Sequence, residues 1–390
     1  MPHPIFRKGV CLVAATVSVV GSPAMSQTET MITLDAQTMA SSNPFLIEGP
    51  NRGAILTQFS ASPEFKLTGD TGSSIDLSGT VSEKWFSQHY GNYVVGKFDA
   101  LGRYRHNEYL TLEADGSFSH DLSVDMLTSS VDAVIDPESL RTDYDGTLRL
   151  HWTPDAHTEI VPEVGYEATN YSNSTLLRDT RALKTSLAVT HRISPYTQIG
   201  VRAEAMFNKA VGQLAQNSQA VYATIKQDIS EHWQLTAEVG AQRTEQRAGP
   251  LQDPSASGSS SPTRLSGRAE LCRKAEHGLA CLSGLIDSEI SGLGGLQRTM
   301  TGTATVTQDL SQRSSVNGTL EYRHSEAQHG AFPALDSLRA SLRLDRKLGR
   351  NFTLSGTAQY LRRQLSNGGG WIGAAYGGLQ LRFQPGQHHD

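Results

Sequence analysis

The sequence predicts an all-β protein: a transmembrane, antiparallel up-and-down β-barrel of about 18 strands, with 16 as the alternative number. Three observations predict it. Apolar and polar residues alternate along many segments, short turns and long loops alternate between those segments, and the aromatic residues gather at two levels of the apolar face. The composition agrees, because 37% of the 390 residues are hydrophobic and 19% are charged, fewer hydrophobic residues than the usual ~45–50%.

The N-terminus has the features of a secretory signal peptide at residues 1–26. Arg7 and Lys8 precede an apolar run, Val10–Val20, which is too short for a membrane-spanning helix. Small residues at Ala24-Met25-Ser26 predict cleavage near Gln27. We therefore expect export into the periplasm, and the barrel features below predict the outer membrane of a Gram-negative cell as the final location.

Residues 27–53 are polar, and we expect a flexible periplasmic N-terminal segment there, with a small plug as the alternative. The barrel is expected at residues 54–383, followed by a C-terminal tail at 384–390. Segments such as Trp233–Val239 and Phe352–Tyr360 alternate strictly between apolar and polar residues. Alternation of this length predicts strands with one apolar and one polar face. A soluble secreted β-protein remains the alternative, since its strands alternate too.

Short turns recur along the chain about every 38 residues, a spacing that holds two strands, one turn and one loop. Their expected central residues are Leu122, Asp155, Ile193, Ile229, Glu276, Leu310 and Leu348. The alternate connections, such as residues 246–263, are longer and richer in Gly, Ser and Pro. Short turns at one end and long loops at the other are typical of transmembrane barrels.

Aromatic residues on the apolar face fall into two groups, which predict the two girdles that flank the lipid-facing belt of a barrel. The group expected near the short turns comprises Phe118, Trp152, Trp233 and Phe352. The group expected at the other end comprises Tyr144, Tyr322, Tyr360 and Trp371. The outer-membrane lipid bilayer is therefore the first expected partner.

The polar face of the predicted strands would line the lumen. Its candidate lumen-lining residues are Arg149, Glu159, Glu163, Glu167, Arg202, Glu204, Glu238, Arg323, Arg339, Arg343 and Arg382. Unpaired buried charge is costly, so these residues need water or ion-pair partners. One interpretation is a hydrophilic channel for a polar or anionic solute. The other is a charge-paired lumen that only stabilises the barrel.

Two cysteines, Cys272 and Cys281, flank a predicted turn at residues 275–278 and would face each other across it, which predicts a disulfide. The histidines are scattered, with no nucleophile or metal-ligand spacing near them. We therefore expect no enzyme activity, no catalytic residues, no metal and no cofactor. The net charge of −5 does not suggest a nucleic-acid partner.

The C-terminal segment Gly378–Phe383 resembles the terminal-strand signal of Gram-negative outer-membrane barrels, with Gly378, Leu381 and Phe383 in the matching positions. This resemblance implies the barrel-assembly machinery as a partner. Leu381 stands where an aromatic residue is commoner, and seven residues follow Phe383.

Asn43-Pro44-Phe45, the repeated Asp-Leu/Ile-Ser turns and the terminal strand together resemble β-barrel porins associated with exopolysaccharide export, of the kind found in sphingan-type loci. The resemblance implies a channel for export or surface delivery of an exopolysaccharide. The polysaccharide chain or export-complex proteins would then be partners. A general diffusion porin and a non-conducting scaffold barrel of the envelope are the alternatives.

Overall fold

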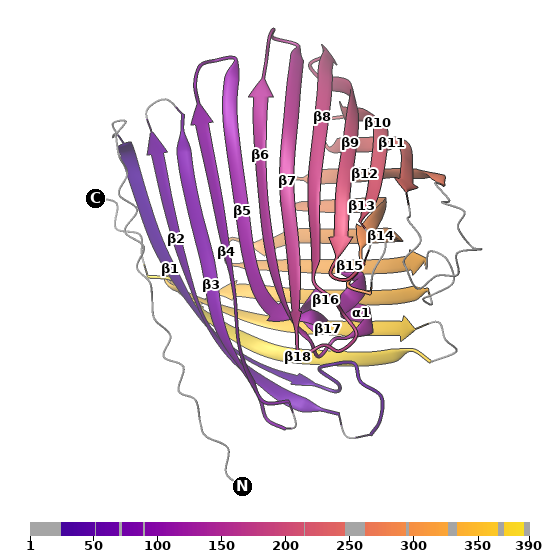
Figure 1. The fold of residues 1–390 in the computed structure, drawn as a ribbon. Helices are drawn as coiled ribbons and strands as arrows, with labels where there is room; N and C mark the ends of the chain where they lie inside the picture. Colours follow the sequence, from indigo (N-terminus) through magenta and orange to yellow (C-terminus); the bar gives the residue numbers. More distant parts are fainter. Residues whose placement is uncertain are drawn as a thin grey trace, which may run out of the picture.

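The protein is a closed antiparallel barrel of 18 strands in a single sheet (Figure 1). The computed structural model describes residues 25–50, 52–69, 72–88, 90–213, 215–245, 262–293, 296–326, 334–365 and 370–385. The strands are β1 Met25–Ser41, β2 Ala54–Gly69, β3 Ser74–Phe86, β4 Asn92–Arg105, β5 Leu110–Leu122, β6 Leu140–Trp152, β7 Thr158–Ser172, β8 Thr180–Ser194, β9 Thr197–Ala210, β10 Gln216–Asp228, β11 Trp233–Glu245, β12 Thr263–Ala275, β13 Gly278–Ile290, β14 Leu296–Ser311, β15 Ser314–Glu326, β16 Leu335–Lys347, β17 Phe352–Leu365 and β18 Ile372–Phe383. The predicted fold class is confirmed.

The first strand corrects the expected domain boundaries. Residues 27–53 were expected to be flexible, but β1 pairs with β2 along its whole length and with β18 from Leu34 to Ser41. The barrel therefore begins at Met25, not at residue 54. Although this segment is polar on average, Ile32, Leu34 and Ala36 alternate with polar residues, which is the pattern of a strand. The predicted signal peptide lies almost entirely outside the described residues.

Short and long connections are sorted between the two ends of the barrel. Short turns follow the even-numbered strands, as at Pro195–Tyr196 and Glu276–His277. One predicted short turn is wrong, because Leu122 ends β5 at the long-loop end and residues 123–139 follow it. Phe118 is accordingly near the long loops, beside its cross-strand neighbour Tyr144, with ring centroids 5.4 Å apart.

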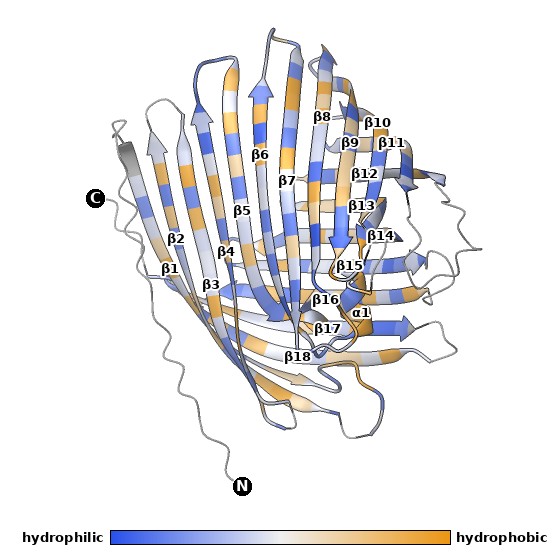
Figure 2. Cartoon of the chain, viewed as in Figure 1, coloured by the Kyte–Doolittle hydropathy of each residue, from blue (hydrophilic) through white to orange (hydrophobic). Residues whose placement is uncertain are grey.

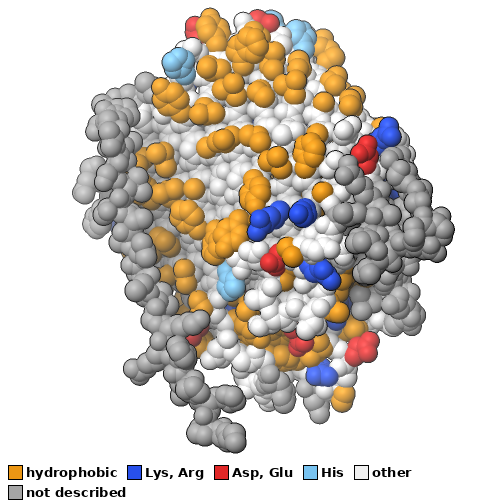
Figure 3. All heavy atoms as spheres, viewed as in Figure 1, with side chains coloured by type: hydrophobic (Ala, Val, Ile, Leu, Met, Phe, Trp, Pro, Cys, Tyr) orange, Lys and Arg blue, Asp and Glu red, His pale blue; other side chains and the backbone are white. Residues whose placement is uncertain are grey.

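The outer surface of the barrel is apolar and exposed. Outward side chains such as Leu187, Leu282 and Leu342 are 47%, 62% and 53% exposed. Hydropathy alternates along the strands (Figure 2), and apolar side chains are spread over the outer face that Figure 3 shows. Exposed apolar area on this scale has to be covered, and in a closed barrel of strands 12 to 17 residues long the fitting cover is lipid.

The buried core lies inside the barrel, at the long-loop end. It contains ten buried apolar residues: Phe45, Leu46, Leu122, Val124, Leu127, Val131, Val134, Leu335, Leu361 and Ala374. Two connections supply most of them. We call residues 123–139, which include the 3-10 turn η1 Ser123–Met126 and the helix α1 Val131–Ile135, the crossing segment. We call Asn43–Ile47 the Phe45 turn. Among the described residues, no helix is long and apolar enough to cross a membrane.

Candidate functional site

All eleven candidate lumen residues point into the barrel. Each alternates with outward apolar neighbours: Arg149 follows the exposed Leu148, Glu204 lies between Ala203 and Ala205, and Arg343 lies between the exposed Leu342 and Leu344. The strand pleat alone produces this sorting. The lumen is charged because the polar residues of the alternating pattern all lie on the inner face of the closed sheet.

One wall of the lumen, on β5–β7, is rich in acidic side chains. Arg149 lies among three of them: its Nη1 is 2.5 Å from Asp115 Oδ2 and 3.2 Å from Glu113 Oε1, and its Nε is 2.6 Å from Glu163 Oε2. Glu159 contacts the imidazole of His151 at 2.8 Å. Arg103 of β4 pairs with Glu113, and Arg141 of β6 pairs with Asp143. Inward carboxylates on β5–β7 still outnumber these cations, so this wall keeps a local excess of negative charge.

A second group of ion pairs runs across β9, β11 and β12. Arg202 contacts Glu204 and, at 2.8 Å, Glu238. Arg268 also contacts Glu238, at 3.1 Å. The Arg202 guanidinium lies 4.6 Å from the ring centre of Tyr222, within cation–π range. These side chains are paired more completely than those on β5–β7.

The wall on β15–β18 is rich in arginine. Arg343 contacts Asp345 at 2.7 Å, and Arg382 contacts Asp35 of β1 at 2.9 Å. Arg339 donates to the backbone carbonyl of Asp125 at 2.8 Å. In a ring of 18 strands, β15 and β16 lie half a turn from β6 and β7. The arginine-rich wall and the acidic wall therefore face each other across the lumen.

The crossing segment is held by arginines of three neighbouring strands. Arg363 of β17 is 6% exposed and donates to the carbonyls of Leu46, Val134 and Ile135. Arg323 of β15 donates to the Thr128 carbonyl at 3.1 Å and pairs with Glu289. Together with Arg339 of β16, these contacts satisfy backbone carbonyls that would otherwise be buried without partners.

The other side of the crossing segment is held through Asp132, which is 2% exposed. Its carboxylate accepts hydrogen bonds from the Tyr171 hydroxyl of β7, from Ser291 Oγ at 2.6 Å and from the Gly292 backbone N–H at 2.8 Å. Strands β7 and β17 lie on opposite sides of the ring. The segment therefore spans the lumen from wall to wall.

Near its start, the crossing segment is tied to β3. Lys84 Nζ lies 2.7 Å from Asp125 Oδ2 and 2.9 Å from Asp121 Oδ1. Burial works to raise the pKa of Asp125, but the Lys84 ammonium outweighs it and holds that pKa below its ordinary value. Asp125 is therefore charged and paired at neutral pH.

The Phe45 turn supplies the remaining loop residues of the buried apolar cluster inside the barrel. Asn43 caps it from both sides, because its Nδ2 donates to the Ile47 carbonyl at 2.9 Å and its Oδ1 accepts the Ile47 N–H at 3.1 Å. Phe45 packs against Tyr90 and Phe86 at 4.7 and 5.2 Å between ring centres. Leu46 adopts a left-handed conformation, with φ of 53°, and this turn holds it fully buried.

Solvent reaches the lumen at the short-turn end. Near the short turns, the inward side chains of Arg382 and Glu159 are 39% and 37% exposed, whereas that of Arg323, beside the crossing segment, is 7% exposed. Charged side chains on the inner face with this exposure require water around them. The lumen is thus wet and charged at one end and filled at the other.

Cys272 and Cys281 are cross-strand partners on β12 and β13 and form a disulfide. Within the described part of the chain, Glu270 with these two cysteines is the one group of side chains close enough together to share a metal ion. Sulfurs in a disulfide are not thiolates, so this group does not suit a metal.

The terminal-strand residues close the barrel. Phe383 pairs with Leu34 of β1 and with Phe352 of β17. A Cβ on Gly378 would lie 2.4 Å from the Thr38 carbonyl oxygen and from the Met39 side chain, so a glycine here permits the close approach of β1. Recognition by an assembly machinery stays a prediction.

Sequence reasoning missed Asp132, Arg363 and the whole crossing segment. Two signals were present. Val131, Val134 and Ile135 follow a helical spacing, and Leu361 next to Tyr360 breaks the alternation of β17 by placing an apolar side chain inward. Inward apolar residues in a barrel strand indicate that something apolar lies inside.

No protein-family model and no curated protein matches the sequence. Solved structures are similar in fold at low identity. Pseudomonas aeruginosa OpdQ has a TM-score of 0.49 at 9% identity, covering 92% of this chain and 99% of that one. Acinetobacter baumannii OccAB3 has a TM-score of 0.48 at 8% identity, covering 93% and 100%. Pseudomonas aeruginosa OpdK with vanillate has a TM-score of 0.48 at 12% identity, covering 92% and 99%.

Placement in the outer membrane follows from the chain's own surface. A closed barrel with an even number of strands, an apolar outer belt and short turns at one end has the architecture of Gram-negative outer-membrane proteins. Both β1 and β18 meet the short-turn end, which faces the periplasm in such barrels. The long loops and the crossing segment therefore belong to the cell-surface half.

Proposed function

We propose that this porin-like barrel is a diffusion channel for small polar solutes, constricted by the crossing segment. The observation that carries the proposal is the pair of oppositely charged walls around a wet lumen, with acids such as Glu163 on one side and Arg343 on the other. A field directed across the lumen orients solutes that carry both charges, which favours zwitterionic or singly charged small molecules.

The crossing segment sets the size limit in this proposal. It contacts β7, β15, β16 and β17, so a solute has to pass beside it rather than through its position. Its apolar side chains form one cluster with the Phe45 turn and with the inward Leu335, Leu361 and Ala374 of β16–β18. The remaining path is then bordered by the polar strand faces.

Export of an exopolysaccharide stays a prediction from the sequence resemblance, and no contact among the described residues favours it over diffusion. The other alternative, a scaffold barrel that does not conduct, is distinguished by the conductance measurement described below. In a gene deletion, lost uptake of small solutes with normal polysaccharide release supports the diffusion channel, and the reverse supports export.

Conductance in planar bilayers tests the proposal directly. The folded protein, identified by a gel migration that changes on boiling, is expected to give discrete channels. Electrically silent bilayers from folded protein would contradict it and favour the scaffold. An Arg339→Gln/Arg343→Gln variant is expected to shift the reversal potential in a salt gradient toward cations, and Glu163→Gln/Glu167→Gln toward anions.

A further inference from the structure

A group of exposed cations lies on the outer face of the barrel, where β8 and β9 meet the long loops. Arg181 of β8 and Lys209 of β9 are direct cross-strand partners. Arg178, just before β8, donates to the Val211 carbonyl at 3.3 Å and so lies over the end of β9. All three side chains are exposed. We call Arg178, Arg181 and Lys209 the basic triad.

The triad has no acidic partner in the part of the chain that the structure describes. Like charges directly opposite each other on a sheet destabilise it, and among the described residues none of the three forms an ion pair. The neighbouring acid, Asp179, accepts the Tyr171 backbone N–H at 3.0 Å. An anion bound from outside the chain would therefore relieve the repulsion among the three cations of the triad.

The triad stands at the level of the lipid headgroups. Outward residues on β8 run from His191 at the short-turn end through Val189, Leu187 and Leu183 to Arg181. At ~3.3 Å per residue and a tilt near 40°, this stretch spans roughly 25 Å along the membrane normal. That is the height of the apolar band of such barrels. Arg181 is thus placed where the outer leaflet's phosphates lie.

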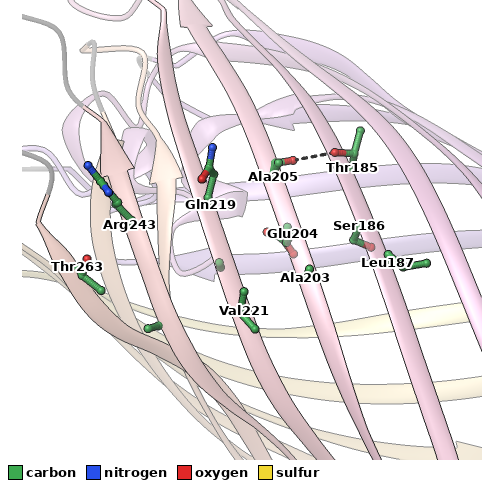
Figure 4. Close-up of a pocket in the computed structure, with 12 residues that line it drawn as sticks. Thr185, Ser186, Leu187, Ala203, Glu204, Ala205, Gln219, Val221, Arg243 and Thr263 are labelled. Atoms are coloured by element: carbon green, nitrogen blue, oxygen red, sulfur yellow. Dashed lines mark hydrogen bonds between the residues drawn. The ribbon is translucent and has the colours of Figure 1, made fainter.

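Below the triad, the lipid-facing surface of β8–β12 is hollowed into a groove of about 620 Å³. Figure 4 shows its floor, where Thr185 and Ala205 lie side by side on β8 and β9 and the Thr185 hydroxyl donates to the Ala205 carbonyl. Ala203 and Ala241 add further small side chains, and Leu187 and Val221 add larger ones. The groove starts four residues along each strand from Arg181 and Lys209.

We propose that this face binds one phosphorylated lipid of the outer leaflet, with its phosphate on the basic triad and an acyl chain in the groove. Arginine presents paired N–H donors that suit phosphate oxygens, and a lysine adds a point charge. The groove is lined largely by apolar side chains, with Gln219, Arg243 and Thr263 among its polar ones. It faces the bilayer and lies next to the triad, so a headgroup and its own chain can occupy both. This inference goes beyond solute passage and is independent of conductance.

The test uses the full barrel, stripped of lipid in detergent and placed in phosphatidylcholine nanodiscs that contain traces of bisphosphorylated lipid A. Native mass spectrometry then measures the lipid retained per barrel. The wild type is expected to retain bisphosphorylated lipid A and not its dephosphorylated form. The Arg181→Gln/Lys209→Gln variant is expected to bind roughly thirtyfold more weakly, from the contribution of each cation to binding of anionic lipid.

The matched control is Arg346→Gln/Arg350→Gln, which removes two exposed cations at the short-turn end of β16 and should leave retention unchanged. Ala205→Trp fills the groove without altering charge and is expected to weaken retention as well. Equal retention by the double variant and the control, or equal retention of the dephosphorylated lipid, would overturn the headgroup site. Unchanged retention by Ala205→Trp would overturn the groove as the place of the acyl chain.

Discussion

The two halves of the lumen are built on the same alternating strands but hold different contents. In the short-turn half, inward charges such as Glu159 and Arg382 are partly exposed and in water. In the long-loop half, the inward Leu335, Leu361 and Ala374 are at most 3% exposed, because the crossing segment and the Phe45 turn cover them. The difference teaches that alternation determines where side chains point, and that inserted loops determine whether those side chains meet water.

The largest effect is expected from Arg363→Ala. The substitution leaves the buried carbonyls of Leu46, Val134 and Ile135 without a donor, which should lower the free energy of unfolding by about 3 kcal/mol. Urea unfolding in detergent micelles measures it, with Arg343→Ala in the wet half as the control. A loss in Arg363→Ala no larger than in the control would mean that the crossing segment is not anchored there.

A pair of leucine truncations sharpens the same comparison. Leu361→Ala removes a side chain that is 3% exposed within the filled half and should cost about 3 kcal/mol. Leu342→Ala removes one that is 53% exposed on the outer face, where lipid fills the space, and should cost about 1 kcal/mol or less. Equal losses in the same unfolding assay would argue against a packed core inside the barrel.

A third effect concerns the hairpin of the wet half. Cys272 and Cys281 close a short loop across β12–β13, with a sequence separation of 9. Removing the bond in Cys272→Ser/Cys281→Ser should lower stability by about 2–3 kcal/mol in the chain-entropy model. Reducing agent should lower the wild type's stability by the same amount and leave the double variant unchanged; a loss in both would point to another cause.

The smallest effect is expected from single charges of the wet walls. Glu163→Gln removes one of three carboxylate partners of Arg149, and the other two remain. Because the site is partly exposed, the stability change should stay below about 1 kcal/mol. The effect should instead appear in the reversal potential, shifted slightly toward anions. A large loss of stability without such a shift would favour the interpretation of the lumen as purely structural.

Most of the barrel could be predicted from period-two patterning, because a strand's pleat ties sequence position directly to a face. That is why all eleven candidate lumen residues point inward. The crossing segment could not be predicted in the same way. Its position depends on contacts between distant parts of the chain, such as Asp132 with Ser291 and Arg363 with Val134, and no local period encodes them.

Single-channel conductance of the wild type, compared with a variant in which residues 124–138 are replaced by a short Gly-Ser linker, tests the central claim most directly. The crossing segment occupies the lumen between β7 and β17, so its removal should raise the conductance severalfold in a barrel whose gel migration still changes on boiling. An unchanged conductance in that folded variant would contradict the account.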